Sequence, residues 1–385
     1  MSKIAGASVP PLGPYSLKAK VVGSVDEVIE LRDLAARMGE SALSGKAAVQ
    51  IKDRPVISAT LSSDLIDIAD FTKGGGSGTD AKPGAQAPSG AKPGAPPAGG
   101  GGERLFPDDP LPVDGLRAAD ANVDLTVEKL LAGKIAVQNV HTAIALRNGN
   151  LAVTPIEADV AKGKLSGMIQ LKASQATPAL DLKLSGKKID VGQLLTDMEI
   201  TDLLYGVINT DIDAAGQGKS MHEIMAGLNG KTSMVMGDGR MKSSAIDTYV
   251  GGAATVLTQA IFGKKSEYTV INCFVSQFDI KDGIATTKAL LFDTEYARIT
   301  GQGTINLGTE RIDLTVDPKP KSVTINTAVP VEIGGTLADP TYRLDPLAAA
   351  AKLGGLIGTV VFPPAAVIGL GELGVSDDNP CMKQG

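Results

Sequence analysis

The sequence predicts a mainly β protein with a few helices, in which an elongated, twisted antiparallel β-sheet forms an open hydrophobic groove capped by C-terminal helices. The first observation behind this fold class is a repeat. Similar tripeptides each open a segment of two strand-like stretches: Leu43-Ser44-Gly45, Leu165-Ser166-Gly167 and Ile299-Thr300-Gly301. The second is the alternation of aliphatic and polar residues along many stretches. A repeated β unit that cannot close its own core is typical of a sheet extended by stacking.

Composition narrows the function classes. The chain has 385 residues, of which 43% are hydrophobic, but only 3% are aromatic and none is Trp. Its formal net charge is −6, and no stretch combines clustered Lys or Arg with aromatic residues. A nucleic-acid binder needs a basic surface to displace counterions. We therefore expect no nucleic-acid partner.

We expect a first β-groove segment over residues 1–71, followed by a linker and a longer domain. Residues 16–20 alternate as a short strand, and Asp26–Met38 carries apolar residues at a helical spacing, so we predict one helix there. Residues 72–103 are rich in Gly, Pro and Ala and cannot bury enough apolar surface to fold, which predicts a disordered linker. Residues 104–385 then form the C-terminal β-groove domain.

Two dense blocks of strands follow the linker. The first is predicted at residues 121–127, 134–140, 142–147, 151–160, 164–171 and 179–184, and the second at 269–280, 284–292, 297–305, 311–316 and 323–333. Asn148-Gly149 and Asp282-Gly283 are typical of two-residue hairpins. Strands joined by tight turns must pair antiparallel, because a parallel pair needs a long crossover.

Helices are predicted at Val191–Asp197, Met221–Leu228, Ser244–Ile261 and Leu347–Leu353. Leu353–Gly371 carries no charged residue and approaches the length of a membrane span. Pro363-Pro364 at its centre favours two short apolar helices that plug one end of the sheet or contact lipid. Together with Ser244–Ile261, the stretch Leu347–Leu373 would cap the groove.

No residue pattern indicates catalysis, a cofactor or a metal. Gly218-Lys219-Ser220 resembles the end of a phosphate-binding loop, but Asp213 stands where the first glycine belongs. Asp211 and Asp213 resemble the start of a calcium loop, but the closing Glu would fall on His222. Asp residues that alternate with apolar ones on strands indicate a solvated sheet face: Asp181, Asp211, Asp213, Asp279 and Asp313. We expect a protein that is not an enzyme.

The cysteines Cys273 and Cys381 allow two interpretations. In a reducing compartment they would be unrelated buried thiols, and in an oxidising one a single disulfide. The sequence favours the disulfide, which would attach the C-terminal tail to a strand.

Alternating aliphatic residues predict the lining of the groove. The candidates are Ile144, Leu146, Leu151, Val153, Ile169, Leu171, Leu182, Leu184, Ile299, Ile305, Leu314 and Val316. A buried sandwich core would give the same alternation. The predicted helices and strands are too few to cover every apolar face, which favours an open groove. Such a groove suits acyl chains, because burying each methylene contributes about 0.8 kcal/mol.

Several motifs in order resemble the C-terminal region of the AsmA family. They are Leu12-Gly13-Pro14-Tyr15, the lead-in Phe106-Pro107-Asp108-Asp109-Pro110-Leu111-Pro112, the Leu-Ser-Gly strand openings, Gly334-Gly335-Thr336-Leu337-Ala338-Asp339-Pro340, and the ending Asp378-Asn379-Pro380-Cys381. The resemblance implies a periplasmic protein similar to chorein-type lipid-bridge proteins. It also implies roles in phospholipid movement between the inner and outer membranes and in outer-membrane assembly.

The same resemblance shapes our expectations of location and partners. Members of the family carry an N-terminal transmembrane helix, which this sequence lacks, so we expect the back part of a longer protein. The implied periplasm is oxidising and agrees with a Cys273–Cys381 disulfide. Phospholipids, the inner and outer membranes and envelope proteins are the expected partners. The alternative is a scaffold or regulator of outer-membrane protein assembly, with a closed, dry sheet.

Overall fold

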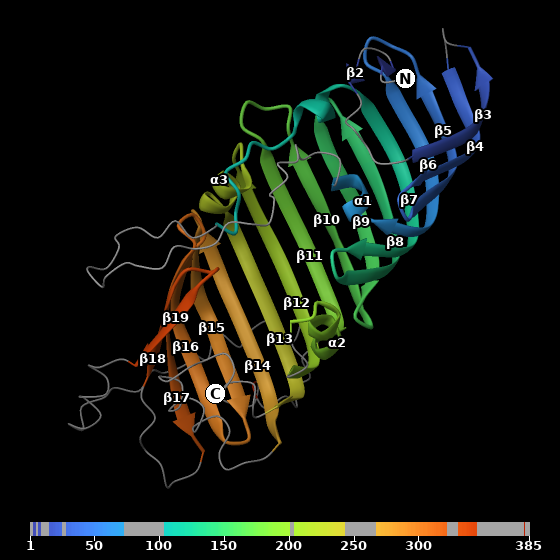
Figure 1. Ribbon diagram of the computed structural model, residues 1–385. Coiled ribbons are helices and arrows are strands. Elements are labelled where there is room, and N and C mark those ends of the chain that lie inside the picture. The colour runs from blue at the N-terminus through green and yellow to red at the C-terminus, as the bar shows by residue number, and fades with distance from the viewer. Residues whose placement is uncertain are drawn as a thin grey trace, which may run out of the picture.

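The computed structural model describes residues 3–4, 7–8, 15–24, 28–72, 104–200, 204–242, 267–321, 330–344 and 381. Two short strands, β1 (Lys3–Ile4) and β2 (Ala7–Ser8), pair with each other. The other strands, β3 to β19, follow one another in a single long, twisted sheet (Figure 1). The mainly β fold class predicted from the sequence is confirmed.

The strands are long for a globular protein. The first half of the sheet contains β3 (Tyr15–Gly23), β4 (Val28–Met38), β5 (Ser41–Gln50), β6 (Val56–Asp67), β7 (Asp120–Ala132), β8 (Ile135–Arg147), β9 (Asn150–Val160), β10 (Gly163–Lys172) and β11 (Ala179–Asp190). The second half contains β12 (Leu204–Gln217), β13 (Asn229–Lys242), β14 (Tyr268–Lys281), β15 (Ile284–Thr294), β16 (Ala297–Asn306), β17 (Arg311–Pro320), β18 (Val331–Gly335) and β19 (Pro340–Leu344).

The sheet is open at both ends. Among the described residues, β3 pairs with β4 alone and β19 with β18 alone, so these two strands are its edges. Neighbours in the sequence are neighbours in the sheet, and nearly all pairs are antiparallel, as the tight turns predict. Each new strand therefore extends the sheet by one step in the same direction.

The pair β6–β7 is parallel and interrupts this pattern. The chain leaves β6 at Asp67 and enters β7 at Asp120, so the intervening residues must bring it back to the side from which β6 started. Strands on both sides of the predicted linker thus lie in one continuous sheet.

The strand ends define two long margins of the sheet. We call the margin where β7 begins the first margin and the one where β7 ends the second margin. Helix α3 (Met221–Ala226), between β12 and β13, lies at the first margin. Helices α1 (Ala69–Thr72) and α2 (Val191–Asp197) follow β6 and β11 at the second margin. A short 3₁₀ helix, η1 (Asp114–Arg117), precedes β7.

Several local predictions are confirmed. Helices occur at Val191–Asp197 and from Met221, although the second ends at Ala226 rather than Leu228. Both predicted hairpin turns have positive φ at their two central residues, for example 51° at Asn148 and 77° at Gly149. The predicted strands at 134–140 and 142–147 are one strand, β8, with a bulge near Asn139 (φ 50°).

The helix predicted at Asp26–Met38 is wrong, because Val28–Met38 forms strand β4 instead. A bulge at Asp33, whose φ is 51°, shifts the alternation by one residue. Before the bulge, Ile29 and Leu31 point to one face, and after it Leu34 and Ala36 point to the same face. The shift gives a strand the apolar spacing that resembles a helix.

Other expectations lie outside the described residues. These are the helices at Ser244–Ile261 and Leu347–Leu353, the apolar stretch Leu353–Gly371, most of the linker, and residues 323–329 of the strand predicted at 323–333. The structure also contains strands β12 and β13, for which the sequence pattern predicted no residue ranges.

The predicted repeat corresponds to a structural unit. In each copy the glycine of the tripeptide pairs with an aliphatic residue of the next strand: Gly45 with Leu61, Gly167 with Leu184, and Gly301 with Val316. In the first two copies that next strand ends in an Ile-Asp pair, with Ile66 and Ile189 buried. Asp67 accepts a hydrogen bond from the backbone N–H of Ala69, and Asp190 from that of Gln193, so each carboxylate begins a short helix.

Candidate functional site

All the predicted groove residues lie on one face of the sheet. Residues paired across neighbouring strands share a face. Leu146, Leu151 and Leu171 form one such row, and Ile144, Val153, Ile169 and Leu182 the next. Along β16 and β17, Ile299, Ile305, Leu314 and Val316 point to the same side, by the registers that link every strand between. We call this side the apolar face.

The apolar face is largely half-buried rather than sealed. Ile299 and Val316 are 7% and 8% exposed, whereas the other predicted groove residues are only half-buried. At the β3 edge, Leu17 and Val21 are 62% and 68% exposed. Side chains of a single layer shield one another partly, and a second layer is needed to bury them completely.

Two short helices cover the apolar face at opposite margins. At the first margin, Ile224 of α3 is 1% exposed and packs with Leu228 against Ala214, Ile280 and Ala285. At the second margin, Leu194 of α2 packs against a cluster that contains Ile189, Ile208, Met236 and Ile271. The helices therefore form two raised borders, with a strip of sheet between them.

Strand β13 crosses that strip. Its residue Met236 is 3% exposed in the α2 cluster, while Met234, two positions nearer the middle, is 36% exposed. Met234 pairs with Thr210 and Ser276, which makes the centre of the strip less apolar than its borders. The Thr210 hydroxyl donates to the Ser233 carbonyl, so it is already satisfied by the backbone.

The segment 104–118, which we call the strap, runs along the first margin. Its end at Leu105 contacts the β16–β17 turn, Leu111 donates its N–H to the Lys219 carbonyl near α3, and Arg117 donates to the Ala173 carbonyl of the β10–β11 turn. Asp120 then accepts a hydrogen bond from Asn148 N–H in the β8–β9 turn. The strap thereby returns the chain across many strands to the start of β7, which explains the parallel β6–β7 pair (Figure 1).

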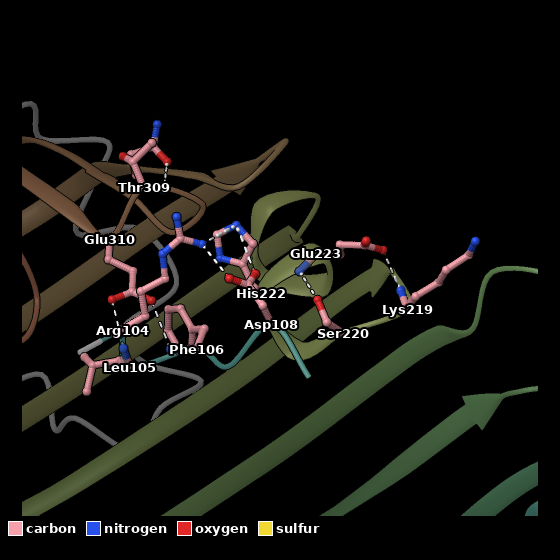
Figure 2. A network of polar contacts seen from close by, with 11 residues as sticks. Arg104, Leu105, Phe106, Asp108, Lys219, Ser220, His222, Glu223, Thr309 and Glu310 are labelled. Carbon is pink, nitrogen blue, oxygen red and sulfur yellow. Dashed lines mark hydrogen bonds and ion pairs between the residues drawn. The ribbon is translucent and has the colours of Figure 1, made fainter. Parts of the chain in front are cut away.

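Glu310 anchors the far end of the strap (Figure 2). Its side chain accepts hydrogen bonds of 2.9 Å from the N–H groups of both Leu105 and Phe106, and Glu310 is only 4% exposed. Burial by itself would raise the pKa of Glu310, but these two N–H donors, with Arg104 and His222 nearby, lower it overall. The residue is therefore held as a carboxylate.

The strap also contacts α3 in the same region (Figure 2). The Arg104 guanidinium lies 3.0 Å from the Asp108 carboxylate and 3.3 Å from the His222 ring. The backbone N–H of His222 donates a hydrogen bond to the Pro107 carbonyl. The lead-in motif at 106–112 is thus an attachment that keeps α3 in place over the apolar face.

The opposite face of the sheet is mostly polar and carries cross-strand ion pairs, although Val235, Val275 and Leu291 of β13–β15 are buried on it. The alternating Asp residues all point to this side, as predicted. Lys183 pairs with Asp213 at 3.1 Å, Lys187 with Asp211 at 3.2 Å, and Lys288 with Asp279 at 3.0 Å. These side chains, with Lys231 and Ser233, line a hollow of about 580 Å³. Exposed pairs of this kind contribute little stability, and their main effect is to keep this side hydrated.

Cys273 lies on the polar face of β14 and is bonded to Cys381, with their Cα atoms 6.1 Å apart. Beside it, Asp293 is 1% exposed and interacts with Asn272, Arg298 and Lys321. Burial would raise the pKa of Asp293, but the hydrogen bonds from those partners lower it overall. The buried carboxylate is therefore charged and compensated, which is typical of a structural site.

Potential metal ligands do not cluster in the described part of the chain. It contains no group of three or more His, Cys, Asp or Glu residues placed to hold a metal ion. No helix within the described ranges is both long and apolar enough to cross a membrane.

Sequence reasoning located the apolar face but missed its borders and the strap. The Ile-Asp exit was a usable signal for α2, because Asp190 is a helix N-cap. Nothing local in the sequence connects Glu310 with Leu105, which lie 205 residues apart.

Comparison with known proteins gives a family and a relative. The model of the AsmA family matches residues 17–290. The chain is also similar to the AsmA family protein YhjG of Escherichia coli (strain K12), with 24% identity over 392 residues. The match covers 98% of this chain and 56% of that protein, so the chain spans a little over half the length of this relative. No solved structure matches.

Proposed function

Because the chain belongs to the AsmA family, we propose that its apolar face shelters phospholipid acyl chains in the cell envelope. The observation that carries the proposal is the continuity of this face through all strands from β3 to β19, with two helical borders and a less buried strip between them. The role is non-enzymatic, because sheltering a tail breaks no bond.

The dimensions support this proposal. With neighbouring strands about 4.8 Å apart, the sheet is on the order of 75 Å long. An acyl chain reaches across half of a hydrocarbon core of about 30 Å, or about 15 Å. One tail would therefore cover three or four strands, and several lipids fit along the face. Each sheltered methylene contributes about 0.8 kcal/mol, which offsets the cost of leaving the bilayer.

The setting of this activity is part of the proposal. The chain would act in the periplasm, in association with the inner membrane. It would support lipid transport between the inner and outer membranes and outer-membrane assembly. The pairing of its cysteines agrees with an oxidising compartment.

A double substitution at the centre of the apolar face tests the proposal. Ile169 and Leu182 are directly paired, and Ile169→Asp with Leu182→Asp would place two carboxylates where a tail should lie. We expect native mass spectrometry of the gently purified protein to show bound phospholipid in the wild type and at least a tenfold lower lipid-bound fraction in the variant, since burying a charge next to a tail is costly.

The control introduces one carboxylate on the other face of β10, against the two of the double variant. Ser166 is exposed and lies on the polar face, so Ser166→Asp should keep the wild-type lipid content. Circular dichroism of all three proteins checks that the sheet is retained. A lipid-free wild type, under conditions in which a known lipid carrier retains its lipid, would contradict the proposal.

A scaffold role is the second candidate, and the open edges favour it. Both β3 and β19 lack a second neighbour among the described strands, and an unpaired edge can accept a strand from another protein. In that case the double apolar-face variant would still bind its protein partners, and the wild type would carry no lipid.

A further inference from the structure

A cluster of two tyrosines and an arginine lies close to the second margin. The Arg240 guanidinium carbon is 4.9 Å from the centre of the Tyr205 ring and 5.0 Å from that of the Tyr268 ring. The two rings meet edge to face, with centres 6.2 Å apart. The Arg240 guanidinium thus makes a cation–π contact with each of two touching aromatic rings.

The strand registers place this cluster where the two faces of the sheet meet. Tyr205 pairs with Arg240, and Arg240 with Val270, all on the polar face. Their chain neighbours Leu204 and Met241 point to the apolar face. Strand β12 begins at Leu204 and β13 ends at Lys242, so only one or two residues separate Arg240 from the second margin.

Arg240 is exposed, and no carboxylate of a described residue forms an ion pair with it. The nearby Glu295 instead accepts the N–H of Val270 at 3.0 Å. A guanidinium presents its N–H donors in a fork that matches two phosphate oxygens. Because the rings restrict its motion, little side-chain entropy remains to be lost on binding.

Exposed aliphatic side chains flank the cluster on the same face. Val270 is 47% exposed and Val207 is 48% exposed. Tyrosine, arginine and exposed aliphatic residues together are typical of the boundary between lipid and water. An inorganic anion would gain nothing from these aliphatic neighbours, whereas the glycerol backbone of a lipid would.

We infer that Tyr205, Arg240 and Tyr268 bind the phosphate of a glycerophospholipid headgroup whose tails lie on the apolar face. The inference rests on the proposed function and specifies its ligand. A lipid whose tails lie on the apolar face near β13 and whose headgroup extends around the strand ends at the second margin would bring its phosphate to Arg240. The cluster would hold the headgroup while α2 borders the tails.

Three soluble probes distinguish binding of the headgroup from binding of the tails. They are dihexanoyl-phosphatidylglycerol below its micelle concentration, dihexanoylglycerol, which has the tails without phosphate, and sn-glycerol 3-phosphate, which has phosphate without tails. Binding to the full chain is followed by native mass spectrometry and by tyrosine fluorescence. The chain has six tyrosines and no Trp, so tryptophan emission does not mask the tyrosine signal. The variants are Arg240→Gln and Arg240→Lys, with Arg37→Gln as control.

We expect Arg240→Gln to weaken phosphatidylglycerol binding about tenfold and to leave dihexanoylglycerol binding unchanged. Arg240→Lys keeps the charge without the fork and should recover only part of the loss. Arg37 is an exposed strand arginine on the polar face of β4, and Arg37→Gln should bind every probe like the wild type.

The remaining outcomes each overturn the headgroup assignment. If Arg240→Gln binds phosphatidylglycerol like the wild type, the headgroup site is wrong while the sheltering of tails stands. If sn-glycerol 3-phosphate binds as tightly as the lipid, the cluster is a site for free phosphate compounds. If the wild type binds neither lipid probe, the proposed function itself fails, and the headgroup site fails with it.

Discussion

At the scale of single residues, Glu310 shows how one side chain secures a long-range connection. Its buried carboxylate accepts hydrogen bonds from two backbone N–H groups of the strap. Its own carbonyl accepts the N–H of Leu337, so Glu310 also contacts the segment between β18 and β19. A single acidic residue thus joins the strap to the last strands of the sheet.

Replacing Glu310 with Gln should destabilise the protein by about 1–3 kcal/mol at pH 7, because the amide offers one acceptor for two N–H donors. The folded-state pKa of Glu310 is below its ordinary value of 4.5. Its stabilising contribution is therefore fully present above pH 4.5 and is lost as the pH falls through the lower, folded-state pKa. Urea unfolding at several pH values measures the difference.

Glu332 provides the control for this experiment. It is an exposed residue of β18, and Glu332→Gln should leave the free energy of unfolding unchanged at every pH. An equal loss in the two variants, or a Glu310→Gln effect that persists below the folded-state pKa, would show that the carboxylate does not anchor the strap.

At the scale of elements, the regular strands and turns were predictable, and the irregular ones were not. Val191–Asp197 and the Asn148-Gly149 turn follow from local chemistry, a cap and a two-residue hairpin. Strand β4 was mistaken for a helix because the bulge at Asp33 gives its apolar residues a spacing that resembles that of a helix. Bulges are set by pairing with a neighbouring strand, which one segment alone does not reveal.

Strand β13 shows a second reason why some elements could not be predicted from the sequence. It contains Gly230, Gly237 and Gly239 and few β-branched residues, so its local propensity for a strand is low. Its neighbours β12 and β14 impose the extended conformation. The apolar face was recoverable from alternation alone, whereas its borders and the Tyr–Arg–Tyr cluster depend on contacts between distant strands.

The repeat glycines make the element-scale argument testable. Gly45 has φ 146°, and a Cβ there would lie 2.1 Å from the Thr60 carbonyl oxygen of the next strand. Gly45→Ala should therefore cost about 1–3 kcal/mol and lower the melting temperature. At Gly115 of η1, no atom lies within 4 Å of the position that a Cβ would occupy, so Gly115→Ala should melt like the wild type. Equal melting of both variants would contradict the close approach at the repeat.

At the scale of the whole molecule, the sheet grows by addition of neighbours, and the hydrophobic clusters of its described residues do not merge into one central core. The described hydrophobic clusters are spread along it, one near β6–β10, others near α2, near α3 and at β16–β18. Stability in such a structure is mostly a sum of nearest-neighbour terms. Long-range links therefore have a large effect on cooperativity.

The Cys273–Cys381 bond is one such link, because it closes a loop with a sequence separation of 108 residues. Cys381→Ser should lower the free energy of unfolding by about 2–5 kcal/mol, by restoring freedom to the unfolded chain. Denaturant unfolding with and without a reductant measures it: the wild type should lose stability on reduction, and Cys381→Ser should not respond. A reductant-sensitive Cys381→Ser protein would refute the assignment.

The strap has a mechanical consequence for the sheet as a whole. It connects the turns along the first margin, from the β8–β9 hairpin to the β16–β17 hairpin. The described residues contain no matching segment along the second margin. A sheet whose turns are connected along one margin resists stretching at that margin and flexes at the other. The strap therefore stiffens the first margin, which lies opposite the margin near Arg240.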